Sequence, residues 1–382
     1  MEKVSIIPCE DYKVDDIYLA IKKGIKDIGF KIKKGSKVLI KPNVLAGNPP
    51  EKATVTHPKV IEALCKLLKE RDCDITIGDS SAYYVKGFTM TNFKEVGIEE
   101  IAKVYKVKLM AFEREKITVA NKHKSRFFEN IFIPVPYKDF DLIINVPKLK
   151  VHSLTKISGA IKNMYGVIPG GIKQYYHDQL KVLFNYERLW GEFLNDVYLN
   201  LTPDLCILDG IIGLERDGPA ATGDPKRVGV IMVSKNGWAM DYVISKLIEE
   251  NVEEIPVLAD AQKRNLINFK KIKIIGKIPS IDFVKVSKKS KKPKLINWMI
   301  SKLWNQLYVQ PKINLSKCNL CMECLKECPV NAITLYDNKV VIDQKSCIHC
   351  YGCENYCPQK AIYFKGSLIN RIINTFRKII KI

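Results

Sequence analysis

Eight cysteines in the last quarter of this 382-residue chain have a spacing suited to metal chemistry. They form two identical runs, Cys-x-x-Cys-x-x-Cys-x-x-x-Cys-Pro, at residues 318–329 and 347–358. Three thiolates spaced by two residues can hold one iron–sulfur cluster from a tight loop, while the fourth, followed by proline, leads away and ligates the other cluster. The pattern therefore predicts two [4Fe-4S] clusters and the transfer of single electrons.

This crossed pattern divides the cysteines into two groups. The first ligand set is Cys318, Cys321, Cys324 and Cys357, and the second ligand set is Cys328, Cys347, Cys350 and Cys353. Structural zinc is the main alternative, because paired Cys-x-x-Cys motifs also bind zinc. Zinc takes its thiolates in separated pairs and has no use for the third cysteine of each run. A disulfide framework is a weaker alternative still.

Short strands are expected around the two cysteine runs. Residues 333–335 and 340–342 flank a turn at 337–339, and an Ala-Ile pair follows each run at the same distance. This repetition indicates an internal duplication. Residues 312–365 resemble bacterial-type ferredoxins with two clusters, and the resemblance implies a small α+β domain and electron transfer at low potential.

The rest of the chain is long enough to form a large core, since 47% of all residues are hydrophobic and 27% are charged. No apolar run is long enough for a membrane span and no signal peptide is apparent, so we expect a cytoplasmic protein. The expected parts are an α/β domain at 1–280, a basic linker with an amphipathic helix at 281–311, the ferredoxin domain at 312–365 and a basic amphipathic helix at 366–382.

Strand-like and helix-like runs alternate before the linker, which predicts an α/β domain with a largely parallel sheet. Strands are expected at 4–7, 37–40, 74–78, 108–112, 142–146, 205–209 and 228–233. Helices are expected at 15–28, 58–71, 94–105, 154–164, 179–199 and 238–250. Loops after the strands of such sheets commonly build the binding site.

Polar residues follow several of these strands and suggest a pocket for a small anion. The candidate catalytic residues are Lys148, His152, Lys162 and Asn163. Lys41 and Lys150 would add positive charge to the pocket. Asp79, Asp209 and Glu215 could hold a divalent cation or transfer protons. The structural alternative is that the lysines are solvated at strand ends and that Asp79 caps the next segment.

Several short segments carry a resemblance to a known family. They are residues 41–43, 56–58, 78–80, 147–152, 159–166, 209–210, 218–219 and 236–241. With them, residues 1–275 resemble the iron–sulfur-associated family called domain of unknown function 362. The resemblance implies a fold and a link to redox chemistry, without a substrate. Arg216 departs from the family, in which glycine commonly follows the preceding glutamate.

A formal net charge of +21 is compatible with nucleic acid, anionic lipid, an acidic redox partner or a heat-adapted surface. Nucleic acid is disfavoured, because no nucleic-acid-binding motif accompanies the charge. Amphipathic patterns at 295–308 and 369–380 would either clamp the ferredoxin onto the α/β domain or contact an anionic membrane peripherally, and we favour the clamp.

These observations favour a redox protein that relays single electrons between an external redox protein and a small anionic ligand in the α/β domain. The protein would then be an oxidoreductase of unknown substrate. One alternative is a non-enzymatic electron carrier or a maturation factor for a cofactor or metalloprotein. In a third reading the clusters are purely structural.

Overall fold

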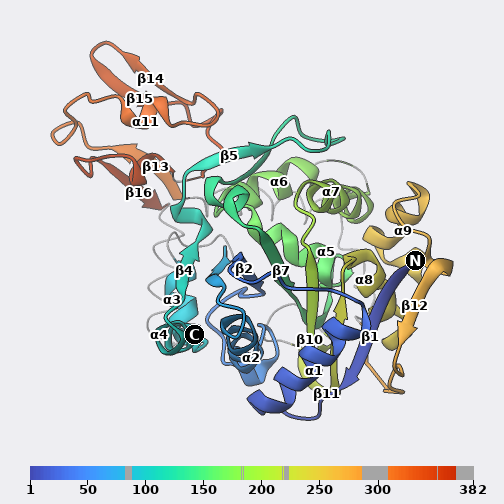
Figure 1. Cartoon of the computed structure of the whole chain (residues 1–382). Coiled ribbons are helices and arrows are strands. Elements are labelled where there is room, and N and C mark those ends of the chain that lie inside the picture. The colour runs from blue at the N-terminus through green and yellow to red at the C-terminus, as the bar shows by residue number, and fades with distance from the viewer. Residues whose placement is uncertain are drawn as a thin grey trace. The chain divides into compact units, whose positions relative to one another are not determined.

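A computed structural model of the chain describes residues 1–81, 88–181, 183, 185–216, 218, 223–285, 309–350 and 352–366. The chain divides into two compact units, Met1–Ser287 and Lys288–Ile382, which are described separately (Figure 1). The expected amphipathic helices, and all of the lysine-rich linker beyond Lys285, lie outside the described residues. Among the described residues, no helix has both the length and the apolar character that a bilayer crossing requires.

The first unit is built on a mixed, mostly parallel sheet. Its described strands run in the order β12-β1-β11-β10-β7-β2-β3-β4, and β8 and β9 are attached beside β10. These strands are β1 (Glu2–Pro8), β2 (Lys37–Pro42), β3 (Asp74–Asp79), β4 (Lys108–Ala111), β7 (Leu142–Val146), β8 (Lys148–His152), β9 (Lys156–Ile157), β10 (Leu205–Glu215), β11 (Asp224–Ser234) and β12 (Ile272–Ile275). Strand β11 is antiparallel to both of its neighbours, whereas β4, β3, β2, β7 and β10 run parallel. The predicted α/β class with a largely parallel sheet is confirmed.

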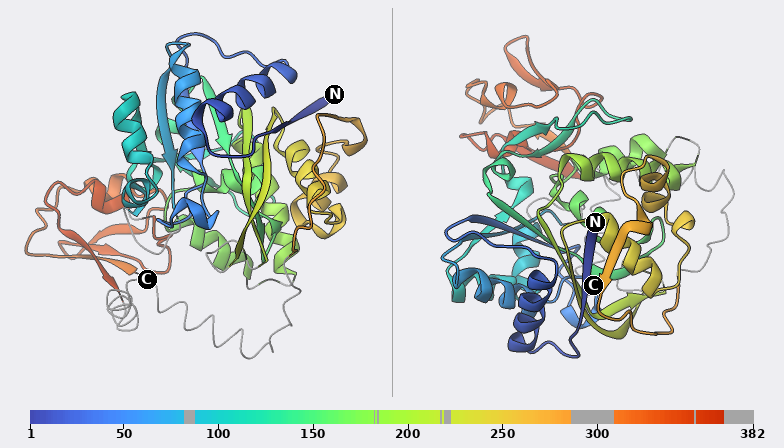
Figure 2. Two further views of the ribbon diagram at one scale, coloured as in Figure 1. Left: turned by 90° about the horizontal axis from the view of Figure 1, so that it is seen from below. Right: turned by 45° about the vertical axis from the view of Figure 1, so that its right-hand side comes forward.

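Helices cover both faces of this sheet (Figure 2). They are α1 (Val14–Asp27), α2 (Pro58–Lys69), α3 (Phe88–Glu95), α4 (Ile98–Tyr105), α5 (Ala160–Met164), α6 (Ile172–Lys181), α7 (Tyr186–Asn200), α8 (Gly237–Leu247) and α9 (Pro256–Lys263). Helix α1 buries Ile17, Ile21 and Ile25, whose four-residue spacing makes one apolar face. Gly24 lets this helix approach the sheet, because a Cβ atom there would lie 2.5 Å from Val233.

Smaller elements complete the unit. A separate hairpin consists of β5 (Ile117–Ala120) and β6 (Ile131–Pro134). Short 3₁₀ turns occur at η1 (Pro50–Lys52), η2 (Phe112–Arg114), η3 (Val135–Asp139), η4 (Tyr165–Val167), η5 (Val252–Glu254) and η6 (Phe269–Lys271).

Three helix predictions need correction. The expected helix at 94–105 is divided, because Gly97 adopts a φ of 85° between α3 and α4. The expected helix at 154–164 is wrong in its first half, where β9 forms, and only α5 is helical. The expected helix at 179–199 is two helices, with α6 ending at Lys181 and α7 starting at Tyr186. In addition, residues 148–152, expected in a loop, form the buried strand β8.

The second unit contains two small antiparallel sheets and two short helices. Its described elements are β13 (Val309–Ile313), α11 (Glu323–Lys326), β14 (Ile333–Tyr336), β15 (Lys339–Ile342), α12 (Gly352–Asn355) and β16 (Ile362–Gly366). Strand β13 pairs with β16, and β14 pairs with β15. Asp337 and Asn338 turn the β14–β15 hairpin with φ values of 47° and 51°, so the predicted hairpin is confirmed.

The two halves of this unit repeat each other residue by residue. Cys318 donates its backbone N–H to Asn314, and the equivalent Cys347 donates to Asp343. Leu320 and the equivalent His349 both have positive φ, at 58° and 52°. The predicted duplication therefore extends to the backbone conformation of the cysteine loops.

Candidate functional site

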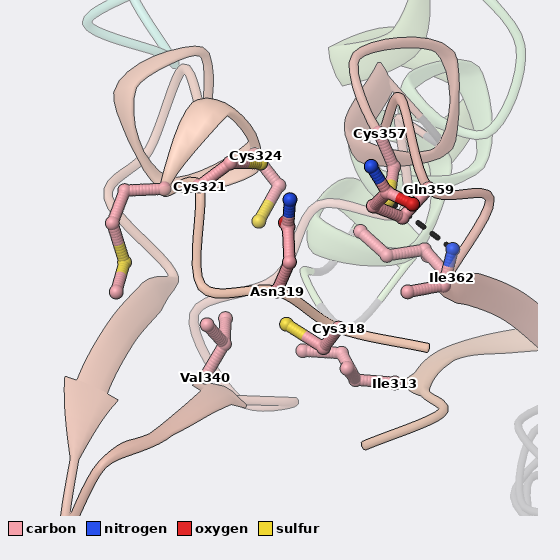
Figure 3. Close-up of a pocket in the computed structure, with 11 residues that line it drawn as sticks. Ile313, Cys318, Asn319, Cys321, Cys324, Val340, Cys357, Gln359 and Ile362 are labelled. Carbon is pink, nitrogen blue, oxygen red and sulfur yellow. Dashed lines mark hydrogen bonds between the residues drawn. The ribbon is translucent and has the colours of Figure 1, made fainter. Parts of the chain in front are cut away.

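The first ligand set lines a single pocket in the second unit. All four of its cysteines border this pocket, together with Asn319, Gln359 and several apolar residues (Figure 3). Three of the cysteines come from the loop before α11 and from α11 itself, whereas Cys357 arrives from the other half of the unit. The structure thus brings these four sulfur atoms around one space.

The cysteine charges act mainly within the two predicted sets, although Cys324 of the first set also acts on Cys353 of the second. Burial raises the pKa of Cys324 to about 11, and negative charge on Cys357, Cys321 and Cys318 raises it further. Burial raises the pKa of Cys350 to about 12, with further contributions from Cys347 and Cys328. Four thiolates held this close would repel one another, so a positively charged partner such as the iron of a cluster would stabilise their deprotonated form.

Backbone hydrogen bonds to sulfur complete the surroundings of both sets. Ala332 donates its N–H to the Sγ of Cys328 at 3.2 Å, and Ala361 donates to the Sγ of Cys357 at 3.2 Å. Each acceptor is the cysteine that crosses to the opposite set. Such N–H donors stabilise negative charge on cluster sulfur, so the donor set fits [4Fe-4S] clusters.

The first unit holds a second group of functional candidates, here called the lysine cluster: Lys41, Lys148, Lys150, Lys162 and Lys173. They come from the end of β2, from β8, from α5 and from α6. Except for Lys162, which is partly exposed, these residues are buried. The cluster lies where the parallel strands end, which is where α/β sheets bind ligands.

Lys41 forms a buried ion pair with Asp79. Its Nζ lies 2.7 Å from Asp79 Oδ1 and 2.8 Å from the carbonyl oxygen of Pro42. The other Asp79 oxygen accepts the N–H of Val44 at 2.8 Å. A Cβ atom on Gly166 would lie 2.6 Å from Lys41 Nζ, so only glycine fits against this pair.

Lys148 forms a second buried ion pair, with Asp209. Its Nζ lies 2.8 Å from Asp209 Oδ2 and 2.8 Å from the hydroxyl of Tyr12. Tyr12 donates to the other Asp209 oxygen at 2.9 Å, and the N–H of His57 donates to Oδ2 at 2.8 Å. The Tyr12 and His57 rings stack at 3.6 Å, and burial lowers the pKa of His57 to about 4.

Lys150 is held by uncharged groups instead. Its Nζ donates to Asn43 Oδ1 at 2.6 Å and to the carbonyl oxygen of Thr54 at 2.7 Å. Burial lowers the pKa of Lys150 well below its ordinary value, and the charges of Lys162 and Lys148 lower it further. Asn43 in turn donates to Asn163 Oδ1 at 2.9 Å.

Asn163 is therefore part of a buried amide network. Its Nδ2 donates to Asn145 Oδ1 at 2.7 Å, and Asn145 donates to the carbonyl oxygen of Ala160 at 2.9 Å. This network joins β2, β7 and α5. Asn163 is committed to other protein groups rather than directed toward an open pocket.

Lys162 and Lys173 belong to neither of the two lysine–aspartate ion pairs. Burial lowers the pKa of Lys162 to about 8, with a further contribution from Lys41. Lys162 has no hydrogen bond or ion pair to another residue in the described part of the chain. Burial lowers the pKa of Lys173 to about 7, and its Nζ donates to the carbonyl oxygens of Ser80 and Ser81.

The lysine cluster thus contains more positive than negative charge. Its ion-paired carboxylates within the described residues are Asp79 and Asp209, while Glu113 acts on Lys173 from a greater distance. An unpaired buried ammonium is unfavourable unless it loses its proton or gains an anion. The arrangement therefore suits a small anion near Lys162.

Other predicted residues lie apart from this group. The N–H of Leu154 donates to His152 Nδ1 at 3.0 Å. Glu215 accepts the N–H of Val284 at 2.8 Å, and Arg216 next to it has a φ of 64°, which explains why glycine suits that position. Asp79, Asp209 and Glu215 lie in three separate environments. In the described parts of the chain, no three His, Cys, Asp or Glu side chains form a single-ion site.

Sequence reasoning missed three contributors: Tyr12, Lys173 and the role of Asp241. The Asp241 carboxylate accepts the N–H groups of Ala160 at 2.5 Å and Ile161 at 3.1 Å, and so caps α5. The sequence did offer a signal for Asp241, because this residue lies in segment 236–241, one of the segments that resemble the family. Tyr12 and Lys173 had none, because only the folded chain brings them to the cluster.

Comparisons with known proteins agree with this two-part organisation. Residues 38–246 match the family model described as domain of unknown function (DUF362), and residues 310–361 match a 4Fe-4S dicluster domain. The thylakoid-associated protein sll1697 of Synechocystis is 29% identical over 272 residues, which is 70% of this chain and 81% of the relative.

Further matches cover smaller parts or are weaker. A ferredoxin-like protein in the nif region of Sinorhizobium fredii is 45% identical over 53 residues, covering 12% of this chain and 83% of that protein. Among solved structures, the lactate racemase apoprotein of Thermoanaerobacterium thermosaccharolyticum aligns with a TM-score of 0.42 and 12% identity, over 67% of this chain and 57% of that chain.

Proposed function

The chain belongs to the family described as domain of unknown function DUF362 and carries a ferredoxin-like 4Fe-4S domain, and from this premise we propose that it relays single electrons to or from a small anion bound at the lysine cluster. Two [4Fe-4S] clusters, one in each ligand set, would each take up and release one electron at a time. An external redox protein would supply or remove these electrons.

The observation that carries the proposal is the excess of lysine over carboxylate in the cluster. Lys41 and Lys148 are neutralised by Asp79 and Asp209, so they act as structural parts of the site. Among the described residues Lys162 has no such partner, and it is partly exposed, which makes it the residue most able to bind a carboxylate or phosphate.

Fusion of the two parts in one chain supports the redox aspect. A covalent link raises the effective concentration of an electron donor beside its acceptor. This gain is useful only where the α/β domain consumes or supplies electrons.

The test is an anaerobic thermal-shift measurement on reconstituted full-length protein with inorganic phosphate and with small mono- and dicarboxylates. We expect at least one of these anions to raise the melting temperature, and Lys162→Ala to remove the shift while cluster absorbance stays intact. Lys66→Ala is the matched control, because Lys66 pairs with Asp15 on the surface. A shift that survives in Lys162→Ala would contradict the assignment of this residue.

A non-enzymatic electron carrier or maturation factor is the second candidate. The observation in its favour is that polar side chains at the lysine cluster, such as Lys148 and the neighbouring Asn163, already have protein partners. In that case none of the anions would stabilise the protein, although the clusters would still take up electrons from a low-potential reductant.

A further inference from the structure

The duplicated halves of the second unit differ at the positions that face a cluster. The halves align so that Cys318 corresponds to Cys347 and Cys328 to Cys357. At the same offset, Asn319 corresponds to Ile348 and Gln359 corresponds to Val330. The backbone is the same in both halves, so the side chains are what distinguishes the two cluster sites.

Asn319 and Gln359 belong to the first site. Both line the pocket that the first ligand set surrounds, as Figure 3 shows. Each carries an amide, which has two N–H donors and a strong dipole. The second half has purely aliphatic side chains, Ile348 and Val330, at these positions.

We propose that the two clusters have different reduction potentials, and that the cluster of the first ligand set has the higher one because Asn319 and Gln359 face it. Reduction adds one negative charge to a cluster. Polar groups and hydrogen bonds near the sulfur atoms stabilise that charge and raise the potential, whereas an aliphatic wall does not. This proposal deepens the proposed function and depends on both clusters being present.

Formal charges in the ligand loops do not offset this difference. The first loop, residues 314–324, carries Lys317 and Glu323, and the second loop, residues 343–353, carries Asp343 and Lys345. Each loop therefore has one charge of each sign. The amides remain as the asymmetric feature.

His349 is the polar residue in the second loop that could act in the opposite direction. It corresponds to Leu320, and Leu320 is not among the residues that line the first pocket. Both have the same left-handed backbone conformation. By this correspondence, His349 lies outside the positions that line the pocket.

The direction of electron flow inside the unit follows. An electron that enters at the second site moves to the first site, because the first cluster has the higher reduction potential. In this step the reduced second cluster loses one electron and the oxidised first cluster gains it. At equilibrium a singly reduced protein holds its electron mainly on the first cluster. The first cluster is then the one that passes the electron on to the acceptor.

The experiment is a potentiometric titration of the full-length holoprotein without oxygen, followed by EPR and visible absorbance. We expect two one-electron midpoints that differ by about tenfold in equilibrium constant, which is ~59 mV for a one-electron couple. Asn319→Ile combined with Gln359→Val should lower the higher midpoint toward the other. Ile348→Asn combined with Val330→Gln should raise the lower midpoint and leave the higher one in place.

The outcomes separate the two proposals. Iron and sulfide contents of about eight each per chain establish both clusters, whatever their potentials. With that content, coincident midpoints in the wild type, or midpoints that the first double variant leaves unchanged, would overturn the inference. A content of about half would instead contradict the two-cluster proposal. If the first variant fails to assemble, the second still tests the inference, because it leaves the first site intact.

Discussion

Two buried lysine–aspartate pairs, Lys41–Asp79 and Lys148–Asp209, determine what the other charged residues of the first unit can do. Each lysine lies within 2.8 Å of its carboxylate, and all four residues are almost completely buried. Removing one partner leaves the other charged and without compensation in a dry environment. These residues are therefore poor probes of ligand binding, and Lys162 is the better one.

At this scale we predict that Lys148→Ala lowers the free energy of unfolding by about 3–5 kcal/mol. The loss comes from leaving Asp209 buried without its ammonium partner. The measurement is denaturant unfolding of the full-length protein, monitored through the first unit. A matched double variant, Lys148→Met with Asp209→Leu, should recover much of the loss. A single-variant cost below about 1 kcal/mol, the size of an exposed pair, would contradict the buried-pair interpretation.

The sequence predicts which residue types matter here, but not how they pair. Lys148 and Tyr12 are 136 positions apart, and no local pattern connects them. The cysteine sets are different, because the spacing within each run is enough to predict that its fourth cysteine belongs to the other ligand set. Local geometry was thus predictable at the iron–sulfur sites, whereas the lysine cluster is a product of tertiary contacts.

The short helix α5 positions Lys162, the partly exposed member of the lysine cluster. It carries Lys162 and Asn163, and its first two N–H groups are capped by Asp241 from α8. Gly159 precedes it with a φ of 28°, and a Cβ atom there would lie 2.3 Å from Asp241. Five residues form a helix too short to be stable alone, so this cap maintains it.

We predict a pH effect from this cap. Burial raises the pKa of Asp241 from 3.8 to about 7. The folded state then binds a proton at Asp241 more tightly than the unfolded state. The contribution of this proton to the free energy of unfolding is therefore complete below pH 4 and is lost as the pH rises toward 7. Wild-type protein should lose ~2 kcal/mol more than Asp241→Asn between pH 5.5 and 8, measured by denaturant unfolding. Equal losses in both proteins would show that Asp241 does not titrate in this range.

Strands were predicted correctly where the sequence has a short, mainly apolar run. The expected strands at 4–7 and 142–146 lie within β1 and β7. Strand β8 was missed although Lys148, Leu149, Lys150, Val151 and His152 alternate, because all five side chains are buried and the polar ones resembled a loop. Burial of the polar side of a strand depends on partners that the local pattern does not contain.

The two units of the molecule differ in the size of their described cores. The core of the first unit includes residues from α1, α2, α3 and α4 and from six strands. The hydrophobic cluster described in the second unit is small, with the buried residues Cys324, Ile333, Val340 and Ile362. A domain of that size usually needs metal or disulfides to remain folded.

At this scale we predict that removal of iron from the full-length protein unfolds the second unit alone. Hydrogen exchange should accelerate throughout 309–366, while the amides of β2, β3 and β7 stay protected and the melting transition of the first unit stays in place. Untreated holoprotein is the control. Loss of protection in these strands on chelation would show that the first unit also depends on the clusters.

The exchange of one cysteine between the halves of the second unit has a consequence for heredity. In the proposed ligand sets neither half is complete, since Cys357 belongs to the first set and Cys328 to the second. A deletion that removed one repeat would therefore disable both redox centres rather than one.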